Sequence, residues 1–144
     1  MAKGILVAMD GSKPSAAALQ EAIKMAQERN VPITVLHVQN DIPVYGDAFV
    51  AQETIRQSDE MRDFEQNLLA DAKATCQKAG VASSALMISG SPGWEISKLS
   101  GNYDLVVLGS TGHSTLYSLL LGSTSAYVCE HAKCSVFVVR AKAD

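Results

Sequence analysis

Short apolar runs alternate with longer segments of helical periodicity along this chain, and this alternation constrains the fold more than any other feature. The five runs are rich in β-branched residues and are bounded by turn residues, which is typical of buried strands. They cover residues 4–9, 32–38, 85–89, 104–108 and 135–140. Strands that alternate with helices pair in parallel through right-handed crossovers, with helices on both faces of the sheet. The sequence therefore predicts a doubly wound α/β fold.

Four segments between or beside these runs have helical spacing. The first begins after Ser12, whose side chain is suited to capping, and the last covers residues 123–131. The long second helix is predicted from about Glu53 to Ala79, with Gly80 as its stop signal. Its buried face is predicted to consist of Met61, Phe64, Leu68 and Ala72. Trp94, in the short third helix, is predicted to be a core residue.

Size and charge exclude several classes of function. A chain of 144 residues suits one compact domain over its whole length. The formal net charge of -3 provides no positive field for nucleic-acid backbones. No apolar run approaches the roughly 18–20 residues that span a bilayer, and the first apolar run leaves no room for a signal peptide, so we expect a cytoplasmic protein. Cys76, Cys129 and Cys134 lack C-x-x-C spacing, which predicts reduced, mostly packed thiols and no cysteine-held metal.

A glycine- and hydroxyl-rich segment follows the fourth predicted strand. It runs from Gly109-Ser110-Thr111-Gly112-His113 to Gly122-Ser123-Thr124-Ser125 and reads G-x2-G-x9-G-S. Glycines let a backbone approach an anion closely, and free N–H groups at a helix start, beside hydroxyls, suit a polyphosphate. A sharp strand-to-helix turn also needs glycine, so a structural role is the alternative. Because a structural cap needs only one serine, the excess of hydroxyls favours a bound nucleotide.

This segment, with Asp10 after the first strand and the closing strand at residues 136–140, resembles the universal stress protein family over essentially the whole chain. The family motif G-x2-G-x9-G-(S/T) is matched by Gly109, Gly112, Gly122 and Ser123. The resemblance implies the ATP-binding subgroup and a five-stranded parallel sheet of order 3-2-1-4-5, Rossmann-like and similar to adenine nucleotide alpha hydrolases. Ligands in such sheets bind at the switch point, which here lies where Asp10 and Gly109 close strands one and four.

The resemblance also implies a role for each site residue. Ala8 and Val38 would lie beside the adenine, although Ala8 replaces the proline that is frequent in ATP-binding relatives. Asp10 would lie near the ribose or a metal, with a turn-forming or capping role as the alternative. The sugar and phosphates would be lined by Leu108, Gly109, Ser110, Gly112 and His113. The phosphate end would be held by Gly122, Ser123, Thr124 and Ser125. His113 has an exposed loop position as its alternative, and His37 is expected to be a packed histidine and not a ligand.

The phosphate charge would have to be met without lysine. The glycine segment contains no lysine and no G-x-x-x-x-G-K-[ST] loop, so backbone dipoles and Mg²⁺ or Mn²⁺ would meet it, with Asp10 as the candidate metal ligand. No arginine finger or general base is evident, which predicts binding with at most slow hydrolysis.

The leading hypothesis is therefore a stress-response, ATP-binding regulatory protein. ATP would order the segment from Gly109 to Ser125 and a long polar loop that contains Pro43 and Gly46 and extends to Glu53. The alternatives are a slow ATPase, a protein that binds AMP or a cyclic nucleotide, and a dimeric interaction protein without nucleotide. The closing strand, residues 135–140, would lie at a sheet edge, and the resemblance implies a homodimer through it.

Overall fold

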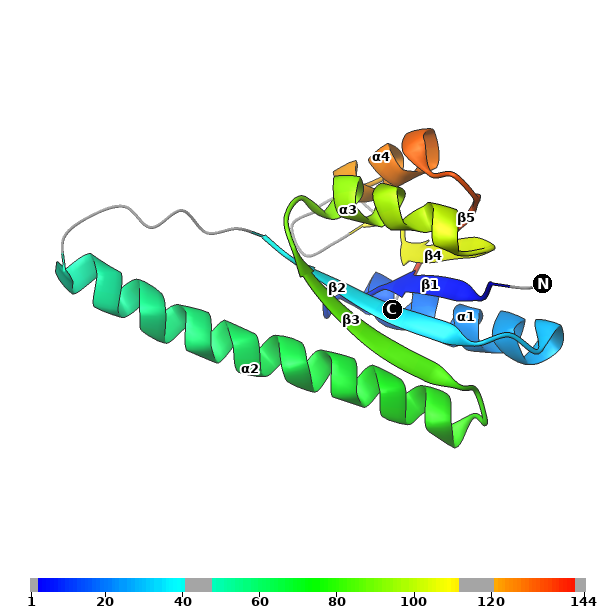
Figure 1. Cartoon of the computed structure of the whole chain (residues 1–144), viewed down its shortest axis with the longest axis horizontal. Helices are drawn as coiled ribbons and strands as arrows, with labels where there is room; N and C mark the ends of the chain where they lie inside the picture. Colours follow the sequence, from blue (N-terminus) through cyan, green and yellow to red (C-terminus); the bar gives the residue numbers. More distant parts are fainter. Residues whose placement is uncertain (1–2, 41–47, 112–120, 142–144) are drawn as a thin grey trace.

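The computed structural model describes residues 3–40, 48–111 and 121–141. Five parallel strands form one sheet in the order β3-β2-β1-β4-β5 (Figure 1). They are β1 (Ile5–Ala8), β2 (Ile33–Gln39), β3 (Ser83–Ser89), β4 (Leu105–Gly109) and β5 (Ser135–Val139). The predicted α/β fold and strand order are confirmed, and each strand lies within about two residues of its predicted bounds.

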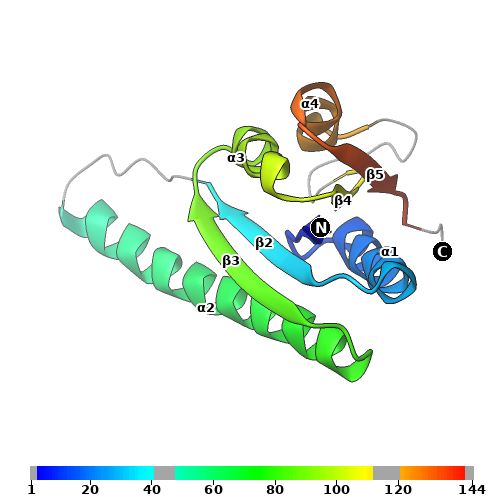
Figure 2. The ribbon, with the colours of Figure 1, turned by 45° about the vertical axis from the view of Figure 1, so that its right-hand side comes forward.

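Helices cover both faces of this sheet. They are α1 (Lys13–Arg29), α2 (Ala48–Lys78), α3 (Pro92–Leu99), which continues into the short 3-10 helix η1 (Ser100–Asn102), and α4 (Ser123–His131). As Figures 1 and 2 show, α1 and α2 lie on one face, and α3 and α4 lie on the other. Within the described ranges, no helix combines the length and the apolar character needed to cross a membrane.

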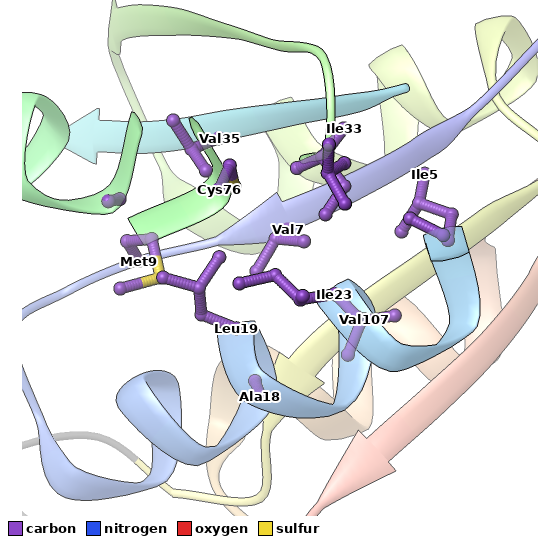
Figure 3. Packing of buried hydrophobic residues seen from close by; sticks show 14 of the residues in the cluster. Ile5, Val7, Met9, Ala18, Leu19, Ile23, Ile33, Val35, Cys76 and Val107 are labelled. Carbon is purple, nitrogen blue, oxygen red and sulfur yellow. The ribbon is translucent and has the colours of Figure 1, made fainter. Parts of the chain in front are cut away.

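The alternation of side chains along the strands divides the core into two layers. Ile5 and Val7 of β1 point toward α1 and α2, whereas Leu6 points toward α3 and α4. Figure 3 shows the first layer, in which Val7 and Val107 pack around Ile23 of α1. Because both faces are buried, the carboxyl ends of β1 and β4 are fixed from both sides.

Two predictions about α2 were wrong. The helix begins at Ala48 and not at about Glu53, since residues 48–78 contain no glycine or proline to interrupt it. Residues 48–53 thus belong to α2, while the rest of the predicted loop, residues 41–47, lies outside the described residues. The predicted buried face is also shifted, because Met61 and Phe64 are 43% and 52% exposed, although Ala72 is buried as predicted. Among residues 59–78 of α2, the buried ones are Glu65, Leu69, Ala72 and Cys76.

Trp94 is not the core residue that the sequence predicted, because its side chain is 58% exposed. The inward face of α3 consists of Gly93, Ile96 and Ser97, which recur at helical spacing. A Cβ atom on Gly93 would lie 2.9 Å from the ring of Tyr127, so α3 approaches α4 closely at this glycine. Trp94 follows Gly93 by one position and therefore points outward.

The three cysteines are free thiols, as predicted, but they differ in burial. Cys76 is buried on the core-facing side of α2, and burial raises the pKa of its thiol. Cys129 is exposed, so the expectation of packed thiols does not hold for it.

Candidate functional site

A cavity of about 440 Å³ lies beyond the carboxyl ends of β1, β2 and β4. Most of the predicted site residues line it, although they come from distant parts of the chain. These are Ala8, Asp10, Val38, Leu108, Gly109, Gly122, Ser123, Thr124 and Ser125. Gly112 and His113 lie outside the described residues. The cavity is at the point where the chain connections from β1 and β4 leave in opposite directions, which is where open α/β sheets bind ligands.

Ser110, another predicted site residue, is not among the residues that line the cavity. It is buried behind the site, where its N–H donates to the Val139 carbonyl oxygen over 2.8 Å. Its own carbonyl oxygen accepts from the Gly122 N–H at 2.6 Å. Ser110 therefore holds the two ends of the glycine-rich segment together, and the neighbouring Thr111 lines the cavity instead.

Gly109 is required by packing. A Cβ atom at this position would lie 2.6 Å from the Pro14 Cβ and 2.7 Å from the Pro14 carbonyl carbon. The first turn of α1 thus rests directly on the end of β4. On the other side, the Ser125 hydroxyl donates to the Gly109 carbonyl oxygen over 2.6 Å. The structural alternative weighed for this glycine is therefore supported, and Ser125 has a structural role as well as a cavity position.

Asp10 forms the turn that leads from β1 into α1. Its Oδ1 accepts from the Ser12 N–H at 2.9 Å, and the Ser12 hydroxyl in turn accepts from the Ser15 N–H at 3.2 Å as the helix cap. Gly11 between them has φ +85°, a conformation that favours glycine. Asp10 also lines the cavity, so its turn-forming role and a ligand-binding role are compatible.

The N-terminus of α4 opens onto the same cavity. Gly122 is its N-cap residue and offers no side chain to the first-turn N–H groups. Such groups carry a partial positive charge and favour an anion, and the hydroxyls of Ser123 and Thr124 lie beside them. Among the described lining residues there is no lysine or arginine. The described part of the chain also contains no group of three or more side chains able to hold a metal ion on their own.

Sequence reasoning missed a polar wall on the α2 side of the cavity. His37 is buried, as predicted, but its ring also lines the cavity together with Glu65. The His37 Nδ1 lies 2.7 Å from the Met9 carbonyl oxygen, and its Nε2 lies 3.1 Å from Glu65 Oε1. Gln39 donates from its side-chain amide to the other Glu65 oxygen. A histidine within an apolar strand was the available signal, since a buried polar ring needs partners.

Further lining residues were not predicted as site residues. They are Met9, Ser15, Leu36, Asn40, Met61, Pro92 and Ile96. Pro92 also begins α3, so it has a structural role as well as a position at the cavity.

Comparison with known proteins defines the class to which this fold and cavity belong. The model of the universal stress protein family matches residues 1–140, so the chain belongs to the universal stress protein family. Universal stress protein YxiE of Bacillus subtilis is 33% identical, over 94% of this chain and 97% of its own length. The structure of universal stress protein UspA from Lactobacillus plantarum is similar, with 27% identity, a TM-score of 0.74, and coverage of 97% of this chain and 99% of that chain.

More distant solved structures share the fold. MJ0577 superimposes with a TM-score of 0.83 at 23% identity and covers all of this chain, with 99% of its own chain matched. A universal stress protein in complex with cAMP has a TM-score of 0.72 at 23% identity, covering 96% of this chain and 97% of that one. An Arabidopsis thaliana member with AMP bound has a TM-score of 0.65 at 21% identity, covering 98% of this chain and 93% of that one.

Proposed function

We propose that this protein is an ATP-binding regulatory protein of the stress response and belongs to the ATP-binding subgroup of its family. The observation that carries the proposal is the convergence of the Asp10 turn and the hydroxyl-rich N-terminus of α4 on one cavity. Fold relatives that were solved with cAMP and with AMP support an adenine nucleotide as the ligand class. AMP and a cyclic nucleotide are therefore the competing ligands in the test below.

The lining suggests an orientation for the nucleotide. Ala8 at the end of β1 and Val38 near the end of the neighbouring β2 form with Leu108 an apolar wall for the base. Gly122, Ser123 and Thr124 begin α4 and suit the phosphate end, because free N–H groups and hydroxyls there bind anions. Gly112 and His113 would complete the phosphate contacts. Ser125 and Gly109 would shape the loop, with Ser110 acting from behind it.

A divalent cation fits this donor set when phosphates supply the remaining ligands. Mg²⁺ and Mn²⁺ are commonly held by one or two carboxylates, phosphate oxygens and water, and Asp10 offers one carboxylate at the cavity. The cation would neutralise phosphate charge, since no lysine or arginine is among the described lining residues. Because the described lining has no lysine or arginine to stabilise a transition state, and no evident general base to activate water, we expect hydrolysis to be slow at most.

We further propose that the protein acts in the cytoplasm as a homodimer. β5 ends the sheet, and no described strand pairs with its outer side. Phe137 on this strand is 43% exposed, so an edge-to-edge contact would cover apolar surface. Nucleotide bound beside β4 would then lie one strand from the dimer contact, where it could influence partner choice.

The test is a nucleotide titration of the double variant Gly122→Val plus Ser123→Ala. The valine side chain would intrude between the α4 N–H groups and the phosphates, and the alanine removes a hydroxyl, so we expect ATP binding to be abolished while the thermal unfolding curve is retained. The matched control is Gly101→Ala plus Ser84→Ala, which changes one glycine and one serine that do not line the cavity. ATP affinity equal to wild type in the folded double variant would contradict the proposal.

A further inference from the structure

A chain of hydrogen bonds connects four elements at the α2 side of the cavity. From β3, the Ser89 hydroxyl donates to the side-chain oxygen of Gln39 over 3.3 Å. From β2, the Gln39 amide donates to Glu65 of α2, and the other Glu65 oxygen faces the His37 Nε2 at 3.1 Å. The His37 Nδ1 then reaches the Met9 carbonyl oxygen at the end of β1, over 2.7 Å. The Glu65 and His37 residues are only 3% and 9% exposed, so water does not compete strongly for these bonds.

The Met9 carbonyl oxygen fixes the hydrogen-bonding role of the His37 Nδ1. A carbonyl oxygen can only accept a hydrogen bond, so Nδ1 carries a proton and donates it to Met9. The Nε2 atom, on the other side of the ring, faces Glu65 Oε1 at 3.1 Å, so the imidazole is held from both sides.

The Met9 peptide groups are held to β2 from both sides. The Met9 N–H donates to the Leu36 carbonyl oxygen over 2.8 Å, and the Met9 carbonyl oxygen accepts from His37. Met9 is the residue before Asp10, so this double contact sets the direction in which the chain enters the Asp10 turn. The turn itself is closed by the bond from the Ser12 N–H to Asp10 Oδ1.

We propose that His37 and Glu65 are positioning residues for Asp10. His37 orients the peptide that precedes Asp10, and Glu65 holds the imidazole in the orientation in which Nδ1 faces the Met9 carbonyl oxygen. This inference rests on the proposed nucleotide site, in which Asp10 contacts the ribose or the metal. It assigns to α2 a direct part in shaping the site, through a residue that does not itself need to touch the nucleotide.

Two substitutions of His37 separate its two hydrogen bonds. The amide of His37→Asn can take the place of Nδ1 and still donate to Met9, whereas the longer His37→Gln places its amide near the Nε2 position and leaves Met9 without a donor. We expect His37→Gln to weaken Mg-ATP binding about tenfold, which corresponds to one lost buried hydrogen bond. We expect His37→Asn to retain most of the wild-type affinity. The control is His131→Gln on α4, because His131 also contacts a backbone carbonyl oxygen through Nδ1 but does not line the cavity.

A double-mutant cycle with Asp10→Asn tests whether His37 acts through Asp10. The asparagine keeps an oxygen for the Ser12 N–H but removes the charge. If His37 positions Asp10, His37→Gln should cost about tenfold in the wild-type background and almost nothing in the Asp10→Asn background. The inference would be overturned if His37→Gln reduced the affinity for Mg-ATP equally in both backgrounds. It would also be overturned if His37→Gln and His37→Asn reduced that affinity equally. Thermal unfolding checks that each variant folds. If His37→Gln does not fold, Glu65→Gln takes its place in the same cycle.

The wild-type titration keeps the two proposals distinguishable. Absence of saturable nucleotide binding in wild type would overturn the proposed function, and this inference with it. Normal wild-type binding with no coupling between residues 37 and 10 would overturn the positioning role alone.

Discussion

Gly109 is the residue at which packing and the proposed binding site meet. It ends β4, lines the cavity and lies so close to Pro14 that no side chain fits between them. The contact between α1 and β4 thus already requires a residue without a Cβ atom at this position. The same feature would allow a phosphate or sugar to approach the backbone. A glycine in a binding motif is therefore not by itself evidence for a ligand, and the Asp10 turn and the α4 N-terminus must carry that argument.

Substitution of Gly109 by alanine should destabilise the fold even without nucleotide. Its Cβ would meet both a side-chain atom and a backbone atom of Pro14, so we expect a loss of about 1–3 kcal/mol in the free energy of unfolding in urea. Gly101→Ala is the matched control, because the nearest neighbour of its added Cβ is the Cδ atom of the flexible Lys133 side chain, at 3.2 Å. A Gly109→Ala variant as stable as that control would show that the α1–β4 contact is loose.

At the scale of single residues, the motif predicted more of the cavity than side-chain periodicity did. Asp10, Gly122 and Thr124 line the cavity as predicted because strand ends and helix starts determine where they lie. Glu65 was missed because a charged residue in a helix is ordinarily assigned to the solvent face. Its burial depends on contacts with His37 and Gln39, which lie 28 and 26 residues earlier in the sequence. A local sequence pattern cannot predict contacts between residues so far apart.

At the scale of elements, α2 is the helix whose sequence is most ambiguous. Met61, Phe64 and Leu68 form an apolar stripe, but the helix instead buries the neighbouring stripe of Glu65, Leu69 and Cys76. The two stripes differ by one residue, which is about 100° of rotation around the helix axis. In this rotation the buried Glu65 carboxyl group contacts the His37 Nε2 and accepts from the Gln39 amide, and these contacts compensate its burial.

This orientation of α2 predicts that truncation of a side chain on the buried stripe destabilises the fold far more than truncation on the exposed stripe. Leu69 is 6% exposed and Phe64 is 52% exposed. We expect Leu69→Ala to cost about 2–5 kcal/mol in the free energy of unfolding, whereas Phe64→Ala should change it by less than about 1 kcal/mol. Urea denaturation followed by circular dichroism measures both. A larger loss for Phe64→Ala than for Leu69→Ala would contradict the observed rotation of the helix.

At the scale of the whole molecule, the strand order decides which segments meet. The order β3-β2-β1-β4-β5 places β1 beside β4, although residues 9–104 lie between these two strands in the sequence. That intervening segment contains α1, β2, α2, β3 and α3. Alternation of strands and helices predicts parallel pairing, but it does not by itself distinguish this order from others; the family resemblance supplied it. The same order leaves the outer side of β5 without a described partner.

The proposed dimer should depend on the outward-facing backbone of β5. The Val139 carbonyl oxygen accepts from Ser110 on the β4 side, so the backbone groups of Val138, one residue earlier, point to the free edge. Val138→Pro removes an outward N–H and spares the contact with β4, and we expect it to yield monomers in size-exclusion chromatography with light scattering. Val138→Thr, which keeps the N–H and the branched shape, should remain dimeric. A Val138→Pro dimer of unchanged mass would refute pairing through this edge.

Binding of ATP by the intact chain is the central claim, and calorimetric titration tests it most directly. Protein stripped of any nucleotide carried through purification would be titrated with Mg-ATP, and then with AMP and cAMP. We expect saturable binding of Mg-ATP near one molecule per chain, tighter than binding of AMP or cAMP. Tighter binding of AMP or cAMP would contradict the choice of ATP, and absence of binding by all three would contradict a nucleotide site at the ends of β1 and β4.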